Sequence, residues 1–140
     1  MAKIRWTSRL GRRAVRRFKK EKVIWLTTVG KGGRPQPRPV WFLWERGRFV
    51  IYSQAPARKL AHIRRNPRVA LNLNSDPDGD DVVVVLGTAR IAKTAPPPNR
   101  VPAYLRKYRS SIKSLGATPE QFAAGYSVAI WITPELLRGI

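Results

Sequence analysis

Six segments of the chain are rich in β-branched and aromatic residues and are bounded by Gly, Pro, Asn or Asp, a pattern typical of β-strands. Turn-forming stretches separate most neighbouring segments, so we expect the strands to pair mainly as antiparallel hairpins. Gly87 lies inside the fifth segment and indicates a bulge or bend there. The predicted strands are residues 23–29, 34–44, 48–53, 68–74, 81–92 and 126–134.

Helical patterns occupy the intervals between some of these strands. Residues 7–22 form a basic segment in which an apolar residue recurs at every fourth position. A short helix is expected at 56–65, with Pro56 near its first position. Two more helices are expected, one at 101–116 and one capped by Thr118. The apolar stripe of the first helix consists of Trp6, Leu10, Ala14 and Phe18.

The segment 34–44 carries Pro35, Pro37 and Pro39 at alternate positions. Backbone N–H groups alternate sides along a strand, so the three missing donors all fall on one side. That side cannot pair with another strand, and this part of the segment should be an edge of the sheet. The same alternation places Arg38, Val40 and Phe42 on one face and Trp41 and Leu43 on the other.

These elements predict a mainly β fold with helices: a six-stranded antiparallel barrel, closed or split, with peripheral helices. A sandwich of this length would leave no room for the helices. We expect one domain over residues 1–140, with a basic helix at 1–22, a barrel core at 23–92, a helical segment at 99–125 and a closing strand at 126–134. The apolar run VVVVL indicates burial on both faces, which in a small barrel suggests a dimer interface.

The strongly positive net charge predicts an anionic partner. The 28 Lys and Arg residues outnumber the 8 Asp and Glu residues, and the net charge is +20. Ten of the basic residues lie between Lys3 and Lys22. A basic nucleic-acid-binding protein is therefore one alternative. Against it, the aromatic residues lie in apolar runs, as core residues do, rather than alternating with basic ones, so we expect no specific nucleic-acid partner.

Composition also excludes several kinds of site. The chain has no Cys and one His, which excludes disulfides and argues against a structural zinc site. The acidic stretch DPDGDD lacks the glutamate that a calcium loop needs. We found no transmembrane run and no secretory signal pattern, so a cytoplasmic protein without a membrane partner is expected.

The stretch YSQAPARKL, residues 52–60, gives the most direct indication of an anion-binding site. Arg58 and Lys59 fall at the start of a predicted helix, where the helix dipole already places positive charge. A phosphate bound by these cations, the free N–H groups and the Ser53 hydroxyl would make the arrangement favourable. A chance pair of surface cations is the alternative.

The only histidine, His62, is interpreted as a surface or structural residue. We found no nucleophile–base pair, P-loop or GxGxxG motif, so no catalytic residue is assigned.

Three segments resemble the pyridoxamine 5'-phosphate oxidase-like, flavin-binding split-barrel superfamily: VIWLTTVGKGGRPQPRPVWFLW, FVIYSQAPARKLAHIRRNPRVALNL and VVVVLGTARI. They cover residues 23–91 in the order of the family. The stretches WLTT, PVWFLW, YSQ and TPEQFAAGYSVAIWITP are most similar to its deazaflavin-dependent branch. That resemblance implies a homodimeric oxidoreductase with coenzyme F-420, which transfers a hydride to a small organic acceptor at sites on the dimer interface. An FMN enzyme and a non-catalytic cofactor carrier are the alternatives within the fold.

The resemblance also implies which residues bind the cofactor. Arg58 and Lys59 would bind its phosphate, and Tyr52 and Ser53 would contact that phosphate from a strand end. The segment from Arg38 to Trp41 would line the phosphate and the ring system. Ala57, Val82 and Val84 depart from the oxidase subgroup, which argues against pyridoxamine phosphate oxidase activity. Trp41 and Trp44 are candidate pocket walls, and Tyr126 and Trp131 are candidate contributions from a second subunit. The implied cofactor-binding set is Arg38, Pro39, Val40, Trp41, Tyr52, Ser53, Ala57, Arg58 and Lys59.

Overall fold

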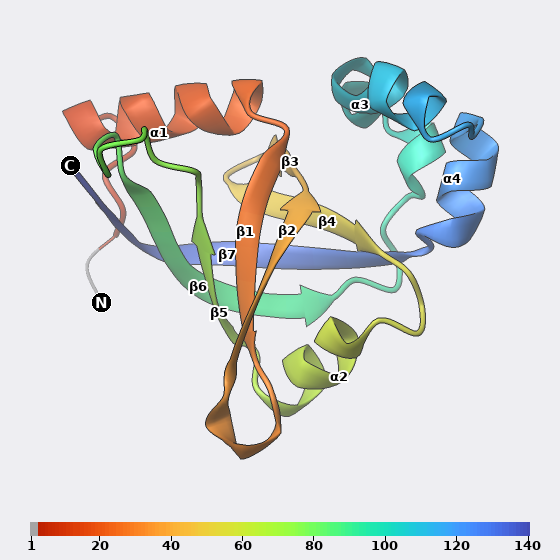
Figure 1. The fold of residues 1–140 in the computed structure, drawn as a ribbon, viewed down its shortest axis with the longest axis horizontal. Helices are drawn as coiled ribbons and strands as arrows, with labels where there is room; N and C mark the ends of the chain where they lie inside the picture. Colours follow the sequence, from red (N-terminus) through yellow and green to blue (C-terminus); the bar gives the residue numbers. More distant parts are fainter. Residues whose placement is uncertain (1–2) are drawn as a thin grey trace.

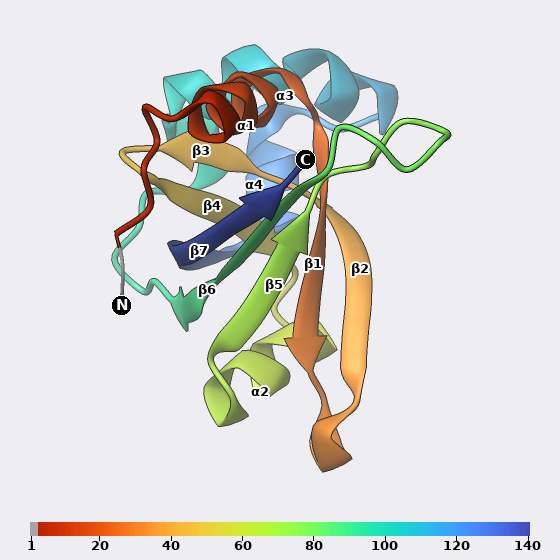
Figure 2. The same cartoon turned by 90° about the vertical axis from the view of Figure 1, so that its left-hand side faces the viewer.

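A single curled antiparallel sheet dominates the computed structural model, which describes residues 3–140 (Figure 1). Within these residues the sheet has seven strands in the order β2-β1-β5-β6-β7-β4-β3. The sheet bends round into a half-barrel, and its two edges are the strands β2 and β3 (Figures 1 and 2). The strands are β1 Val23–Val29, β2 Pro35–Trp41, β3 Leu43–Glu45, β4 Arg48–Ser53, β5 Arg68–Asn72, β6 Val83–Ile91 and β7 Val128–Gly139.

Four α-helices surround the sheet in the described part of the chain. Helix α1 lies across one end of the half-barrel, α2 lies at the opposite end, and α3 and α4 form a separate layer at one side (Figures 1 and 2). None of these helices is long and apolar enough to cross a membrane. The helices are α1 Arg9–Lys20, α2 Arg58–Arg65, α3 Pro102–Ser114 and α4 Pro119–Gly125, and short 3-10 turns occupy Lys31–Gly33 and Pro98–Arg100.

The sheet buries both of its faces along β4. Phe49 and Ile51 point into the barrel core, where Phe18 of α1 also packs. Val50 and Tyr52 point the other way and pack against α3 and α4. Strands that are buried on both faces lose the alternation of polar and apolar residues, which explains the unbroken apolar run in β4.

The prediction of an edge strand at the proline-rich segment is confirmed, because β2 pairs only with β1. The prediction of one continuous strand over 34–44 is wrong. The ladder stops at Phe42, whose backbone N–H donates to the Tyr108 hydroxyl at 2.9 Å and whose carbonyl accepts from that hydroxyl at 2.9 Å. A side chain of α3 therefore replaces the neighbouring strand here, and the sheet has seven strands rather than six.

The glycine bulge is confirmed, since the register of β6 against β7 shifts between Leu86 and Gly87. A methyl group at Gly87 would overlap the carbonyl oxygen of Thr133, so the close approach of the two strands requires glycine. Strand β7 continues five residues beyond the predicted end at Pro134. Pro134 is tolerated because it lies opposite Gly87, where the ladder is already irregular.

Candidate functional site

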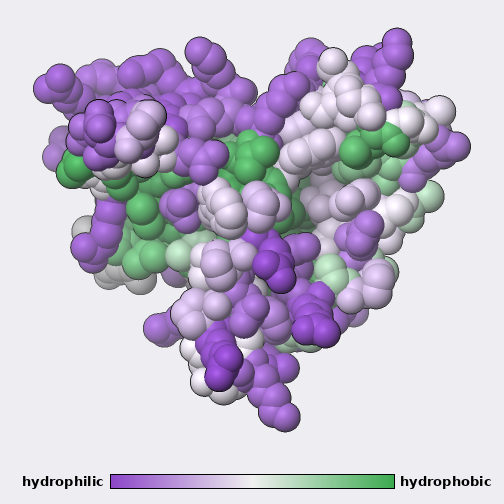
Figure 3. Space-filling view, in the orientation of Figure 1, coloured by the Kyte–Doolittle hydropathy of each residue, from purple (hydrophilic) through white to green (hydrophobic). Residues whose placement is uncertain are grey.

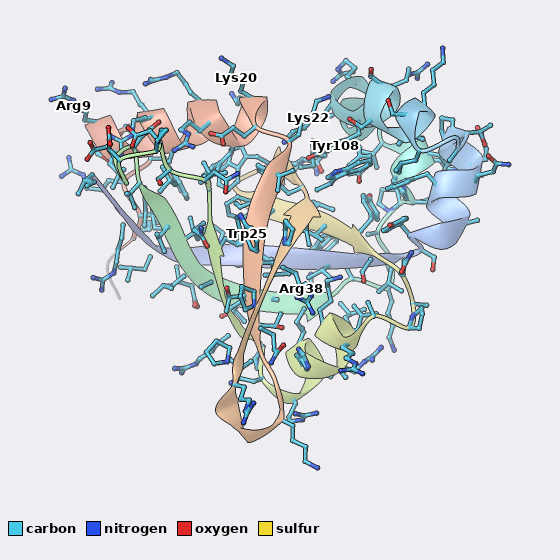
Figure 4. The ribbon with its side chains drawn as sticks, in the orientation of Figure 1. Arg9, Lys20, Lys22, Trp25, Arg38 and Tyr108 are labelled. Carbon is cyan, nitrogen blue, oxygen red and sulfur yellow. The ribbon has the colours of Figure 1, made fainter. Side chains whose placement is uncertain are left out.

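A basic cavity of about 300 Å³ lies between β1, β2 and the start of α2. Three of its residues are Arg or Lys, three more carry other polar side chains that can donate hydrogen bonds, and none is acidic. Such a cavity favours an anion with several acceptor oxygens. It is lined by Leu26, Thr28, Gln36, Arg38, Pro39, Ala57, Arg58, Lys59 and His62. Figure 4 shows Arg38 on β2, on the side of the sheet where α2 lies.

The start of α2 lacks the usual stabilising contacts. Its N-cap residue is Ala57, which makes no side-chain hydrogen bond, and its first turn contains no acidic residue. Arg58 is exposed, whereas Lys59 is half-buried. Burial lowers the pKa of Lys59, and the nearby Arg38 guanidinium lowers it further. An anion in the cavity would complete the helix N-terminus and offset both effects. Pro56, which we expected near the first helical position, precedes the N-cap.

One pair of polar residues lies in the cavity wall. Thr28 is the last inward-facing residue of β1 and is 2% exposed. Its hydroxyl lies 2.9 Å from Nδ1 of His62, and both residues line the basic cavity. The sequence interpretation of His62 as a surface or structural residue is therefore incomplete, because the imidazole also borders a candidate binding site.

A second, aromatic cavity of about 440 Å³ adjoins the basic one. The two cavities share Pro39, Ala57 and Lys59. Most of the other residues are apolar or aromatic, and several come from α3 and α4, so this end of the combined site accepts a planar, largely apolar group. The aromatic cavity is lined by Val23, Pro39, Val40, Trp41, Tyr52, Gln54, Ala57, Lys59, Tyr104, Leu115, Phe122 and Tyr126.

A column of stacked rings supports the wall of the aromatic cavity. Trp41 lies parallel to Tyr108 at 4.8 Å between ring centroids and to Phe122 at 5.5 Å. Phe122 in turn stacks on Tyr126 at 4.5 Å. Offset stacking of this kind holds each ring in one orientation. The column gives the cavity a rigid wall and connects β2 to α3 and α4.

Two residues that were predicted to contact the phosphate form hydrogen bonds with backbone carbonyls instead. Ser53 is 1% exposed, donates its hydroxyl to the Gln54 carbonyl at 3.0 Å and lines neither cavity. Tyr52 lines the aromatic cavity, but its hydroxyl donates to the Pro96 carbonyl at 2.8 Å. Burial, and secondarily the charge of Glu45, raises the pKa of Tyr52 to about 12. In the described residues, the hydroxyl that lines the basic cavity belongs to Thr28.

The other predicted site residues divide between the cavities and the core. Arg38, Pro39, Val40, Trp41, Ala57, Arg58 and Lys59 all line one or both cavities. Trp44 does not; it packs in the core against Trp6, Phe18 and Phe49. Trp131 lines neither cavity and lies beneath the guanidinium of Arg48, which is 3.6 Å from its ring centroid.

Sequence reasoning missed several cavity residues. Thr28 was detectable, since it is the polar residue at a buried position of an otherwise apolar face with Ile24 and Leu26. His62 follows Arg58 by four positions and so lies on the same helix face. No pattern in the sequence marks Tyr104 or Phe122 as cavity residues, because only the packing of α3 and α4 on the sheet brings them to the cavity.

The N-terminal arginines do not extend the basic cavity. Helix α1 and α2 lie at opposite ends of the half-barrel (Figures 1 and 2). Arg9 and Lys20 of α1 point away from the sheet, far from Arg38 (Figure 4). The guanidinium of Arg17, on the same helix, donates to the Asp81 carbonyl at 2.6 Å and holds the helix on the loop before β6. The arginines of α1 and the cations of the basic cavity therefore do not form one continuous basic groove within this chain.

Solved structures with this fold have names that refer to different ligands. An F420 reductase aligns with a TM-score of 0.62 and 22% identity over 86% of this chain and 92% of its own. A FAD-binding protein from Mesorhizobium loti aligns with a TM-score of 0.60 and 18% identity over 89% and 87%. The heme storage protein HutZ from Vibrio cholerae aligns with a TM-score of 0.62 and 16% identity over 90% and 92%. At these identities the likeness establishes the fold alone.

A search among curated protein sequences finds no match. The family model described as pyridoxamine 5'-phosphate oxidase, in contrast, matches residues 12–140, which include the whole sheet, both cavities and all but the first turn of α1. With its curled antiparallel half-barrel and peripheral helices, the chain belongs to the pyridoxamine 5'-phosphate oxidase family.

Proposed function

We propose that this protein is a cofactor-binding oxidoreductase that uses coenzyme F-420 to reduce a small organic acceptor. The observation that carries the proposal is the continuity of the two cavities through Pro39, Ala57 and Lys59. Flavins and deazaflavins join a planar ring to a phosphate by a short polyol chain. The aromatic cavity suits the ring, and the basic cavity suits the phosphate, at opposite ends of one site.

The side chains would bind and orient the cofactor. Arg38, Arg58 and Lys59 would neutralise the phosphate, and Lys59, which lines both cavities, would lie between phosphate and ring. The ring wall formed by Trp41 would hold the acceptor and the cofactor at a fixed distance, and α3 and α4 would keep water out of the aromatic cavity. When bound, the reduced cofactor supplies the hydride, so no side chain has to act as a general base.

Three observations favour the deazaflavin over FMN. Within the fold, the WLTT, PVWFLW and YSQ stretches resemble the deazaflavin-dependent branch, and one structural neighbour carries the name F420 reductase. The phosphate of coenzyme F-420 is a diester that continues into an acidic tail. Arg38 and Arg58, both exposed, leave room and charge for such a tail outside the basic cavity. An FMN-binding flavoprotein is the second candidate, supported by the FAD-binding neighbour.

A flavin-type ring fits this chain better than a heme. Heme iron is usually held by His, Cys, Met or Tyr side chains. The chain has one histidine and no cysteine, and that histidine lines the basic cavity rather than the aromatic one. The tyrosines that line the aromatic cavity are engaged in packing, and the Tyr52 hydroxyl is bonded to Pro96.

Direct titration with both cofactors tests the proposal. The visible spectrum of the purified protein, followed by fluorescence titration with coenzyme F-420 and with FMN, should show tighter binding of coenzyme F-420. Tight FMN binding without measurable affinity for coenzyme F-420 would establish the flavoprotein alternative instead. Turnover of reduced cofactor with a panel of acceptors then separates a reductase from a cofactor carrier, because a carrier binds the cofactor without oxidising it.

We further propose a homodimer that forms through the convex face of the sheet. Leu86 is 39% exposed at the centre of this face, and it lies between Ala70 of β5 and Leu136 of β7 in the strand register. Hydrophobic residues reach the surface below α1, where β5, β6 and β7 run (Figure 3). A second copy of the chain would cover this apolar row, as the family resemblance implies.

A further inference from the structure

The imidazole of His62 is placed to respond to the charge of whatever occupies the basic cavity. His62 lies one helical turn after Arg58, is half-buried and lines the cavity. Its Nδ1 is 2.9 Å from the hydroxyl oxygen of Thr28. Within residues 3–140, this is the imidazole's only hydrogen bond. Its Nε2 lies beside Gly30, in the turn between β1 and β2 that also carries Lys31 and Arg34.

The partner of Nδ1 is compatible with both charge states of the ring. A hydroxyl can donate a hydrogen bond to a neutral imidazole nitrogen, and it can accept one from a protonated nitrogen after rotating its hydrogen. Thr28 is 2% exposed, so its position is set by the packing of β1. Gain or loss of a proton by His62 therefore requires no rearrangement of the cavity wall, and the ring keeps its orientation throughout.

The charges that face His62 determine how a ligand affects it. The charged groups lining the cavity are Arg38 of β2 and Arg58 and Lys59 of α2, while β1 contributes Thr28, which does not titrate. No carboxylate lines the cavity. An anion that enters would be the only negative charge among the residues that line the cavity, and a nearby opposite charge favours the protonated form of a histidine.

We propose that His62 takes up a proton when the phosphate group of a ligand, or a sulfate ion, binds in the basic cavity, so that its imidazolium acts as a fourth cation of the site. The proposal rests on the proposed phosphate site and adds its regulation by pH. Affinity for the anionic group then falls as the pH rises between about 5 and 8, the range in which histidines change charge. Thr28 is the positioning residue that orients the ring.

Sulfate is the suitable probe, because it remains a dianion throughout this range and any pH dependence of its binding must come from the protein. His62 is the only histidine of the chain, so its ring signals in a ¹H–¹⁵N NMR spectrum are assigned without further work. We expect about tenfold tighter sulfate binding at pH 5.5 than at pH 8. Saturating sulfate should move the titration of the His62 signals to higher pH by about one unit.

Variants separate this inference from the phosphate site itself. His62→Gln keeps a hydrogen-bonding side chain but cannot titrate, so it should bind sulfate with little dependence on pH. Lys59→Ala should weaken binding at every pH while leaving the pH dependence in place. If native protein binds sulfate equally at both pH values, or if the His62 signals titrate identically with and without sulfate, the inference is wrong although the phosphate site stands. If native protein and Lys59→Ala bind sulfate equally, the phosphate site itself is wrong.

Discussion

At the scale of single residues, burial distinguishes two cations that look equivalent in the sequence. Arg58 and Lys59 are adjacent and both line the basic cavity, but only Lys59 also lines the aromatic cavity. Lys59 is half-buried and its pKa is lowered by burial and then by Arg38. An anion beside Lys59 is therefore less screened by water than one beside Arg58, and its contact with Lys59 should be the stronger one.

We predict that Lys59→Ala and Arg58→Ala each weaken cofactor binding by about 1.5–3 kcal/mol, the scale of a charged hydrogen bond, with the larger loss for Lys59→Ala. Titration by fluorescence or calorimetry measures both losses. Arg65→Ala is the matched control, since Arg65 is exposed at the other end of α2 and lines neither cavity. Unchanged affinity in both variants would remove the basic cavity as the phosphate site.

At the scale of elements, α2 begins with an uncapped and positively charged turn. Ala57 supplies no capping hydrogen bond. Helix α1 begins differently, because the Ser8 side chain accepts a hydrogen bond from the Gly11 N–H at 3.0 Å. Since free N–H groups and like charges both weaken a helix start, the first turn of α2 should gain most from a bound anion.

Amide hydrogen exchange tests this expectation. The amides of residues 58–61 should exchange more slowly when the cofactor is bound, because the phosphate would accept hydrogen bonds from the helix N-terminus. The first turn of α1 serves as the control, because it lies at the opposite end of the half-barrel and should not change. Protection that increases equally in both helices would indicate global stabilisation rather than a phosphate at α2.

A second element, α3, is held to α1 and the sheet by the half-buried Lys107. The ammonium of Lys107 donates to the carbonyls of Phe18 at 3.1 Å and Phe42 at 2.9 Å. It also lies 3.7 Å from the centroid of the Phe42 ring. Burial lowers the pKa of Lys107 to about 8, and the charge of Glu21 opposes this shift only partly. The folded protein therefore releases this proton at lower pH than the unfolded chain does.

The sign of the resulting pH dependence follows from the protons bound in each state. Below about pH 8, Lys107 is protonated in both states and adds no pH dependence, while the cost of burying its charge is fully present. Between about pH 8 and 10 the unfolded chain binds more protons, so the free energy of unfolding should rise with pH. Denaturant unfolding at pH 7.5 and 9.5 measures this rise, which should be smaller in Lys107→Met. Equal rises in both proteins would show that Lys107 does not cause the effect.

At the scale of the whole molecule, the convex face of the sheet should be the dimer interface. Leu86→Lys places a charge at the centre of this apolar row and should convert the dimer to a monomer without unfolding it, because Leu86 is 39% exposed in the single chain. Light scattering after size-exclusion chromatography measures the mass. Ile140→Lys is the control, since Ile140 is also an exposed apolar residue but lies at the chain end. A monomeric native protein would contradict the proposal.

The sequence alone determined most of the fold because local physics sets it. Alternation, proline parity and capping residues depend on neighbours along the chain. They located most of the strands, the edge at β2, the bulge at Gly87 and the Thr118 cap of α4, but not the break between β2 and β3. The charges at Arg58 and Lys59 indicated an anion for the same reason, since the helix dipole is a local property.

Only the tertiary structure decided where distant residues meet. The Tyr108 hydroxyl interrupts the strand at Phe42, the rings of α3 and α4 build the aromatic cavity, and Thr28 rather than Ser53 supplies the hydroxyl of the basic cavity. Helix α1 lies at the end of the half-barrel opposite α2, so the arginines of α1 lie outside the site of the same chain (Figure 1). Contacts of this kind depend on how the curled sheet brings its ends and helices together, and no local pattern in the chain encodes them.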